Sequence, residues 1–297
     1  MGLLALVSAG GLVLDDRVLV GAPIWAKPFK FSLSFIAYGL TLAWMLSLLP
    51  AGRARRIGWW AGTVLTVASL VEMVLITLQV VRGTRSHFNN ATPFDAAVFQ
   101  IMGATVVVLW LAALVIAVLL LRARILDRAT AWAVRLSSFI ALAGAGIGFA
   151  MVRPTPEQLA VEDPAVVGAH SVGVPDGGPG IPLLGWSTTG GDLRIAHFFG
   201  MHALQLVPLV LLVLAALAPR YARLADDRVR LRLVLVASAA YAATFVLVAW
   251  QALRGQALLS PDALTLSAAC ALVILTVTAT ATALRIPTPA ARQELAA

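Results

Sequence analysis

The sequence is poor in charge. Only 12% of its 297 residues are Asp, Glu, Lys or Arg, whereas 60% are hydrophobic. A soluble domain of this length carries about 25% charged residues. The composition therefore excludes an ordinary soluble fold and predicts an all-α integral membrane protein, with the lipid bilayer as its first partner.

Cysteine is nearly absent. Cys270 is the only one, so no disulfide can form within the chain, and cysteine usage says little about the redox compartment. A signal peptide is not indicated either, because the first apolar stretch, Gly2 to Leu14, lacks a basic segment before it.

Long apolar runs are what the chain has instead. A membrane-spanning helix needs roughly 20 apolar residues. Runs of this kind occupy 31–50, 57–81, 98–121, 131–152, 195–218, 231–253 and 262–284. The stretch Gly2 to Leu14 is too short by this rule, and Asp15-Asp16-Arg17 interrupts it.

Lys and Arg are unevenly distributed between the connections on the two sides of the membrane. The connections 51–56, 122–135 and 219–232, with the C-terminal tail, hold 14 of the 22 basic residues and four of the 14 acidic ones. Because basic loops stay in the cytoplasm, we expect this side to be cytoplasmic. The Pro- and Gly-rich loop 153–194 is then extracytoplasmic and mostly irregular. Basic residues placed between spans favour a multi-pass protein of the inner (plasma) membrane over a nucleic-acid-binding surface.

The two halves of the chain show signs of a duplication. Gln-x-x-Arg-Gly occurs at Gln79 and at Gln251, and several other positions align in the same order at spacings of 167 to 172. This pattern predicts a 4+4 repeat in the same orientation, with 1–128 as the first half and 129–297, including the long loop, as the second. The repeat also makes residues 3–14 a short first helix. It therefore predicts eight helices with both termini cytoplasmic, as in parallel-repeat transporters.

Polar residues inside the spans are the first candidates for a site. Glu72 lies midway along its span, with Gln79 on the same face, and the sequence HFFGMHALQ places His197, His202 and Gln205 on one broad face of another helix. Ionisable groups in spans are costly and usually face protein or water. At 1.5 Å per residue, Glu72 and Gln205 would lie at one depth, so we expect a shared site. The alternative is that these groups only join helices by hydrogen bonds.

Basic residues also gather at the outer ends of the spans, where few are expected. They are Lys27, Lys30, Arg82, Arg85, Arg194 and Arg254. Such a basic mouth would attract a carboxylate, a phosphate, a lipid headgroup or haem propionates. We expect the neighbouring Asp95, Asp192 and Asp262 to cap helices rather than to perform chemistry.

Three functions fit these features. The first is binding or transport of a small, anionic molecule. The ligand-binding residues would be Glu72, Gln79, Arg82, His197, His202, Gln205, Arg254, Arg194 and Lys30. The second is a metal- or haem-dependent membrane enzyme or redox protein. A transition metal or haem b would be held by His87, His197, His202 and Glu72, although their spacing matches no strong motif such as His-Glu-x-x-His. The third is a non-catalytic assembly factor or sensor.

Overall fold

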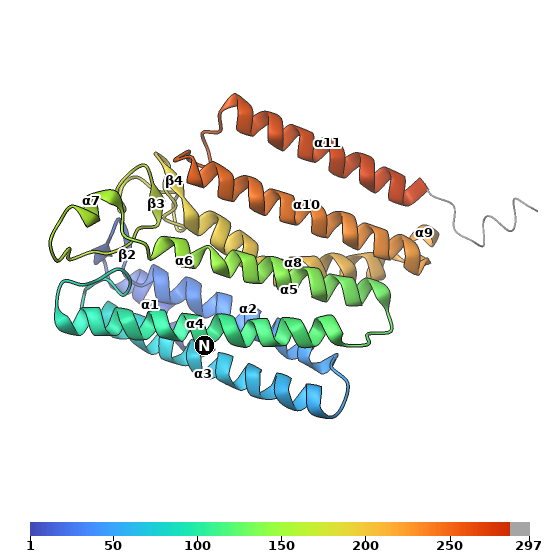
Figure 1. The fold of residues 1–297 in the computed structure, drawn as a ribbon, viewed down its shortest axis with the longest axis horizontal. Helices are drawn as coiled ribbons and strands as arrows, with labels where there is room; N and C mark the ends of the chain where they lie inside the picture. The colour runs from blue at the N-terminus through green and yellow to red at the C-terminus, as the bar shows by residue number, and fades with distance from the viewer. Residues whose placement is uncertain (286–297) are drawn as a thin grey trace, which may run out of the picture.

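The computed structural model describes residues 1–285, and most of them are helical (Figure 1). Seven of the described helices are long and apolar enough to cross a membrane, which confirms the seven predicted spans. They are α2 (Ala26–Ser47), α3 (Arg53–Val81), α4 (Pro93–Arg122), α5 (Arg128–Gly146) with its continuation α6 (Gly148–Met151), α8 (Leu193–Leu217), α10 (Asp227–Leu253) and α11 (Ala263–Arg285). Most begin before the apolar run, because the polar residues of the first turn are helical as well.

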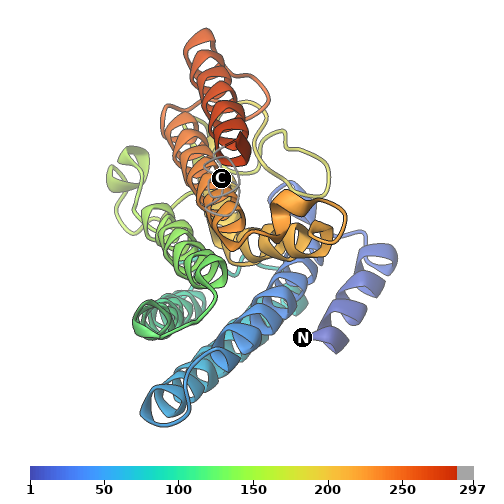
Figure 2. The same cartoon turned by 90° about the vertical axis from the view of Figure 1, so that its right-hand side faces the viewer.

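The first helix is shorter than a membrane span. α1 (Gly2–Leu14) forms as expected, but it contains only 13 residues. At 1.5 Å per residue it extends about 20 Å, whereas the hydrocarbon core of a bilayer is about 30 Å thick. The predicted eighth span is therefore corrected to a short apolar helix that packs against α2 (Figure 2).

The helices pack mainly against their neighbours in the chain. α1 packs on α2, α2 on α3, and α3 on α4, while α8 packs on α5 and α10, and α10 on α11. A close approach joins α5 to α8 at Gly144 and Gly200, where a Cβ built on either glycine would lie 2.5 Å from the backbone of the other. Small residues allow helices in membranes to approach this closely.

The connections at one end of the bundle fold over it, and we call this the loop end (Figure 1, where α7, β3 and β4 gather). β1 (Val18–Leu19) pairs with β2 (Ala22–Pro23), and β3 (Ser171–Val172) pairs with β4 (Gly191–Asp192), both antiparallel. The long segment before α8 also contains the short α7 (Pro156–Leu159) and is otherwise mostly irregular, as predicted. α9 (Ala222–Ala225) lies in the connection between α8 and α10.

Capping residues define where the helices begin at the loop end. The Asp192 side chain accepts a hydrogen bond from the backbone nitrogen of Arg194 at 3.0 Å. Asp262 does the same for Thr265 at 2.8 Å. At α4, Thr92 is the cap and accepts from the backbone nitrogen of Asp95. The predicted structural role of these aspartates is thus confirmed, with Asp262 itself in the capping position.

Candidate functional site

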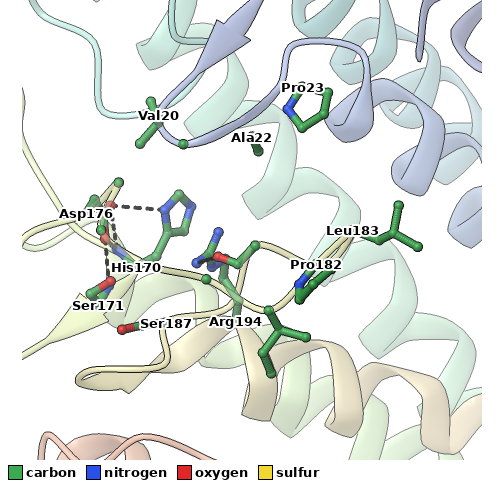
Figure 3. Close-up of a pocket in the computed structure, with 16 residues that line it drawn as sticks. Val20, Ala22, Pro23, His170, Ser171, Asp176, Pro182, Leu183, Ser187 and Arg194 are labelled. Atoms are coloured by element: carbon green, nitrogen blue, oxygen red, sulfur yellow. Dashed lines mark hydrogen bonds and ion pairs between the residues drawn. The ribbon is translucent and has the colours of Figure 1, made fainter. Parts of the chain in front are cut away.

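A polar pocket of about 180 Å³ opens at the loop end (Figure 3). Its walls are the turn between β1 and β2, the loop 176–187, the start of β3, and Arg194 on the first turn of α8. The β1–β2 turn approaches the loop 176–187 at Gly21, where a Cβ would lie 3.0 Å from the carbonyl oxygen of Gly177. The φ of Gly21 is +73°, a conformation that favours glycine. The pocket is therefore assembled from two parts of the chain that are far apart in the sequence, residues 20–23 and residues 170–194.

Arg194 is the cationic group of this pocket, and its orientation is restrained. Its Nε and Nη2 donate to the Asp192 carboxylate at 2.9 and 2.6 Å, and Nη2 also donates to the carbonyl oxygen of Gly185 at 2.5 Å. Nη1 makes no hydrogen bond with any residue in the part of the chain described, 1–285. Asp192 is fully buried and also accepts from the backbone nitrogen of Ser187. One edge of the guanidinium, formed by Nε and Nη2, is thus held by the protein.

His170 and Asp176 form a pair in the same pocket. The His170 ring nitrogen Nδ1 lies 3.0 Å from Asp176 Oδ2. The backbone nitrogens of His170 and Ser171 donate to the same carboxylate at 3.0 and 2.8 Å. Although burial acts in the opposite direction, the hydrogen bond from His170 and these backbone donors hold the pKa of Asp176 well below its usual range. The aspartate is therefore an ionised acceptor that orients the imidazole.

Sequence reasoning did not find this pair. His170 and Asp176 lie in an irregular loop without periodicity, and their spacing matches no motif. The only signal in the sequence was weak. It consisted of a histidine and an aspartate that flank a short segment in the loop before the helix that begins near Arg194.

Among the nine predicted ligand-binding residues, Arg194 lines the pocket and Lys30 supports its wall. Lys30 Nζ donates to the carbonyl oxygen of Leu184 at 2.9 Å, which ties α2 to the pocket loop. The other seven lie outside the set of lining residues. The basic mouth therefore contributes to the pocket through one arginine and one lysine.

Gln79 and Arg82 are engaged in a separate polar network. Asp95 accepts a hydrogen bond from Gln79 Nε2 at 2.8 Å and forms an ion pair with Arg82 at 2.5 Å. In the second half, Arg254 pairs with Asp262 at 2.5 Å. These contacts fasten the connections between neighbouring helices, so the side chains are occupied by the protein itself.

Among the described residues, no hydrogen bond joins Glu72 to His202 or Gln205, although His202 and Gln205 are bonded to each other. Glu72 is 2% exposed, and its Oε1 has no partner among the described residues, although Lys27 is close enough to interact electrostatically. His202 Nδ1 lies 3.2 Å from Gln205 Oε1, and Gln205 Nε2 is buried without a partner among the residues described. α3 packs on α2 and α4, whereas α8 packs on α5, α10 and α2. The shared site thus stays a prediction.

The four proposed metal ligands do not gather. Within residues 1–285, no group of three or more His, Cys, Asp or Glu side chains is arranged to hold a metal ion. His197 Nδ1 is hydrogen-bonded to the carbonyl oxygen of Gly144 at 2.9 Å, and His87 packs against aromatic rings near Lys27 and His170. A multi-ligand centre built from His87, His197, His202 and Glu72 is therefore not formed. A haem needs only one or two histidines, and that alternative stays a prediction.

Comparison of the chain with protein-family models, with curated proteins and with solved structures gives no match. Its seven apolar helices indicate a multi-pass helical membrane protein.

Proposed function

We propose that this protein binds a small anionic molecule in the loop-end pocket, on the extracytoplasmic side of the inner membrane, as the first step of its transport. The observation that carries the proposal is that Arg194 lines the pocket and that its Nη1 has no hydrogen-bond partner among residues 1–285, while Nε and Nη2 are held by Asp192 and Gly185. A restrained guanidinium is well suited to binding carboxylate or phosphate oxygens.

The charge around the pocket supports an anion rather than a cation. Arg194 interacts electrostatically with both Lys27 and Lys30. Arg194 and Lys30 share one carboxylate, Asp192, whereas Lys27 interacts with Glu72. An anion bound at Arg194 would reduce the repulsion among the three cations.

The size of the pocket supports a small ligand. Sites for drug-sized molecules usually have volumes of about 300–1,000 Å³, whereas this pocket has about 180 Å³. A ligand of a few non-hydrogen atoms, such as a short carboxylate or inorganic phosphate, matches this space.

Transport, rather than binding alone, is supported by Glu72. Its carboxyl group is buried in the middle of α3 and lacks a hydrogen-bond partner among the described residues. Such intramembrane groups often belong to ion or proton pathways. The pairs Arg82–Asp95 and Arg254–Asp262 occupy corresponding places in the proposed parallel 4+4 repeat, an organisation found in transporters. The distribution of Lys and Arg supports the extracytoplasmic side, and the repeat pattern supports the same orientation for both halves.

Binding to the purified protein in lipid nanodiscs tests the proposal. We expect saturable binding of at least one of acetate, glycolate and inorganic phosphate, and a loss of about 10-fold or more in affinity for Arg194→Gln, since a charged hydrogen bond is removed. The matched control is Arg254→Gln, which removes an arginine from an Arg–Asp pair outside the pocket and should leave affinity unchanged.

Two results would overturn the proposal. One is that none of these anions binds, or that Arg194→Gln binds them as the wild type does. The other is a Soret band in the visible spectrum of the purified protein, which would favour the haem-dependent alternative.

A further inference from the structure

The hydrogen-bonding state of His170 follows from its contact with Asp176. The Asp176 carboxylate accepts from two backbone nitrogens and from the His170 ring. An ionised carboxylate can only accept hydrogen bonds, so Nδ1 must carry the proton that lies between the two groups. In the neutral ring, Nε2 then carries the lone pair and acts as an acceptor.

The surroundings of the ring favour this neutral form. Burial lowers the pKa of His170, and the nearby cations Arg194 and Lys27 act in the same direction, although the hydrogen bond to Asp176 opposes them. The ring also packs edge-on against Phe88, with centroids 4.8 Å apart, which fixes its orientation.

The acceptor atom is directed toward the proposed anion site. His170 lines the same pocket as Arg194, and Nε2 makes no hydrogen bond with any residue from 1 to 285. Figure 3 shows the bonded ring nitrogen turned to Asp176 and the other ring nitrogen on the side of Arg194. The pocket is therefore lined by both a cationic donor, Arg194, and a neutral acceptor, His170.

We infer that the ligand is an anion that also brings its own hydrogen-bond donor: a small hydroxycarboxylate or a protonated phosphate. Its anionic oxygens would bind Arg194 while its O–H group donates to His170 Nε2. This inference rests on the proposed function and specifies its ligand. A simple carboxylate would leave Nε2 desolvated and unpaired, and an unmade hydrogen bond of this kind weakens binding on the order of 10- to 100-fold.

The decisive measurement compares ligands that differ in one group. Glycolate, acetate and methoxyacetate share a carboxylate, but only glycolate has a hydroxyl donor. Phosphate and sulfate form a second comparison, because only phosphate retains a proton near neutral pH. In nanodiscs at pH 7, we expect glycolate to bind on the order of 10-fold more tightly than both other carboxylates, or phosphate to exceed sulfate by a similar factor. The comparison that shows a difference in affinity identifies which class of ligand the pocket binds, a hydroxycarboxylate or a protonated phosphate.

A variant locates the discrimination at one atom. His170→Phe keeps the aromatic packing against Phe88 and removes Nε2, so the affinity for the donor-bearing ligand should fall to that of its donor-free counterpart. His170→Leu, whose side chain has no hydrogen-bonding atom, should have the same effect and serves if the first variant does not fold. The control is His87→Phe, which changes a histidine outside the pocket and should preserve the discrimination.

The outcomes separate the two proposals. If glycolate and acetate bind equally, phosphate and sulfate bind equally, and Arg194→Gln weakens all of them, the proposed function holds and the inference is wrong. Discrimination that persists in both His170 variants also overturns the inference. If no anion binds, both proposals fail.

Discussion

Asp192 holds Arg194 and caps α8 with the same carboxylate. It accepts from Nε and Nη2 of Arg194 at 2.9 and 2.6 Å and from the backbone nitrogen of that residue at 3.0 Å. A further bond from the backbone nitrogen of Ser187 ties in the pocket loop. The position of the arginine thus depends on the first turn of a membrane-spanning helix.

Removing this carboxylate should destabilise the loop end. Asp192→Ala loses a helix cap and a fully buried anchor, and we expect a loss of about 1–2 kcal/mol in the free energy of unfolding. Chemical unfolding in detergent micelles measures it. Asp192→Asn, which retains an acceptor for the helix start, should lose less. Equal midpoints for wild type and Asp192→Ala would contradict the anchoring role.

Replacing Glu72 should separate stability from transport. Glu72→Gln removes an ionisable carboxyl that has no hydrogen-bond partner in residues 1–285. Because a neutral amide costs less to bury than a charge, the thermal midpoint should be unchanged or higher. Uptake of a bound anion into proteoliposomes under a pH gradient should be lost, since an amide cannot carry the proton, while affinity at the pocket stays the same.

Ser69→Ala provides the control for this experiment. Ser69 is buried on the same helix, and among the described residues its hydroxyl bonds only to the carbonyl oxygen of Leu65 within its own helix. The variant should transport as the wild type does. Normal uptake by Glu72→Gln would show that this residue only contributes to packing.

A single methyl group on Gly200 should force two helices apart. Its Cβ would lie 2.5 Å from the backbone of Gly144 and 2.8 Å from the ring of Phe245. We expect Gly200→Ala to lower the free energy of unfolding by about 1–3 kcal/mol, the usual cost of overpacking. Gly103→Ala on α4 is the matched control, because no neighbouring atom of residues 1–285 lies within 4 Å of its Cβ position. Its stability should be retained or slightly raised. Equal stability of the two variants would contradict the close contact.

Acidification should weaken the loop end. Burial lowers the pKa of both His87 and His170 below the usual value of 6.5, so the folded state binds these protons less readily than the unfolded chain. The resulting stability is fully present above pH 6.5 and is lost as the pH falls through the lowered pKa values. The thermal midpoint should therefore drop between pH 7 and pH 5, and His87→Phe should reduce the drop. A midpoint that is constant or rises on acidification would contradict this origin.

Much of the architecture is a direct consequence of the sequence. Seven runs of roughly 20 or more apolar residues determine seven helices, because a bilayer leaves a chain few other ways to satisfy its backbone. Capping at Thr92 and Asp192 is equally local and was predictable. The short length of α1 could also be predicted from the sequence. The repeat pattern nevertheless favoured a membrane span there, and 13 residues are too few to form one.

The candidate site was decided by tertiary structure. The helical rise predicts the depths of Glu72 and Gln205, but depth does not show which helices are neighbours, and α2 packs against both of their helices. His170 and Asp176 meet Arg194 because an irregular loop returns across the end of the bundle, and no periodicity encodes such a path. Hydropathy therefore determined that this protein crosses the membrane. Only the tertiary structure, through the path of its longest loop, determined that the Arg194 guanidinium and the His170 ring line one pocket.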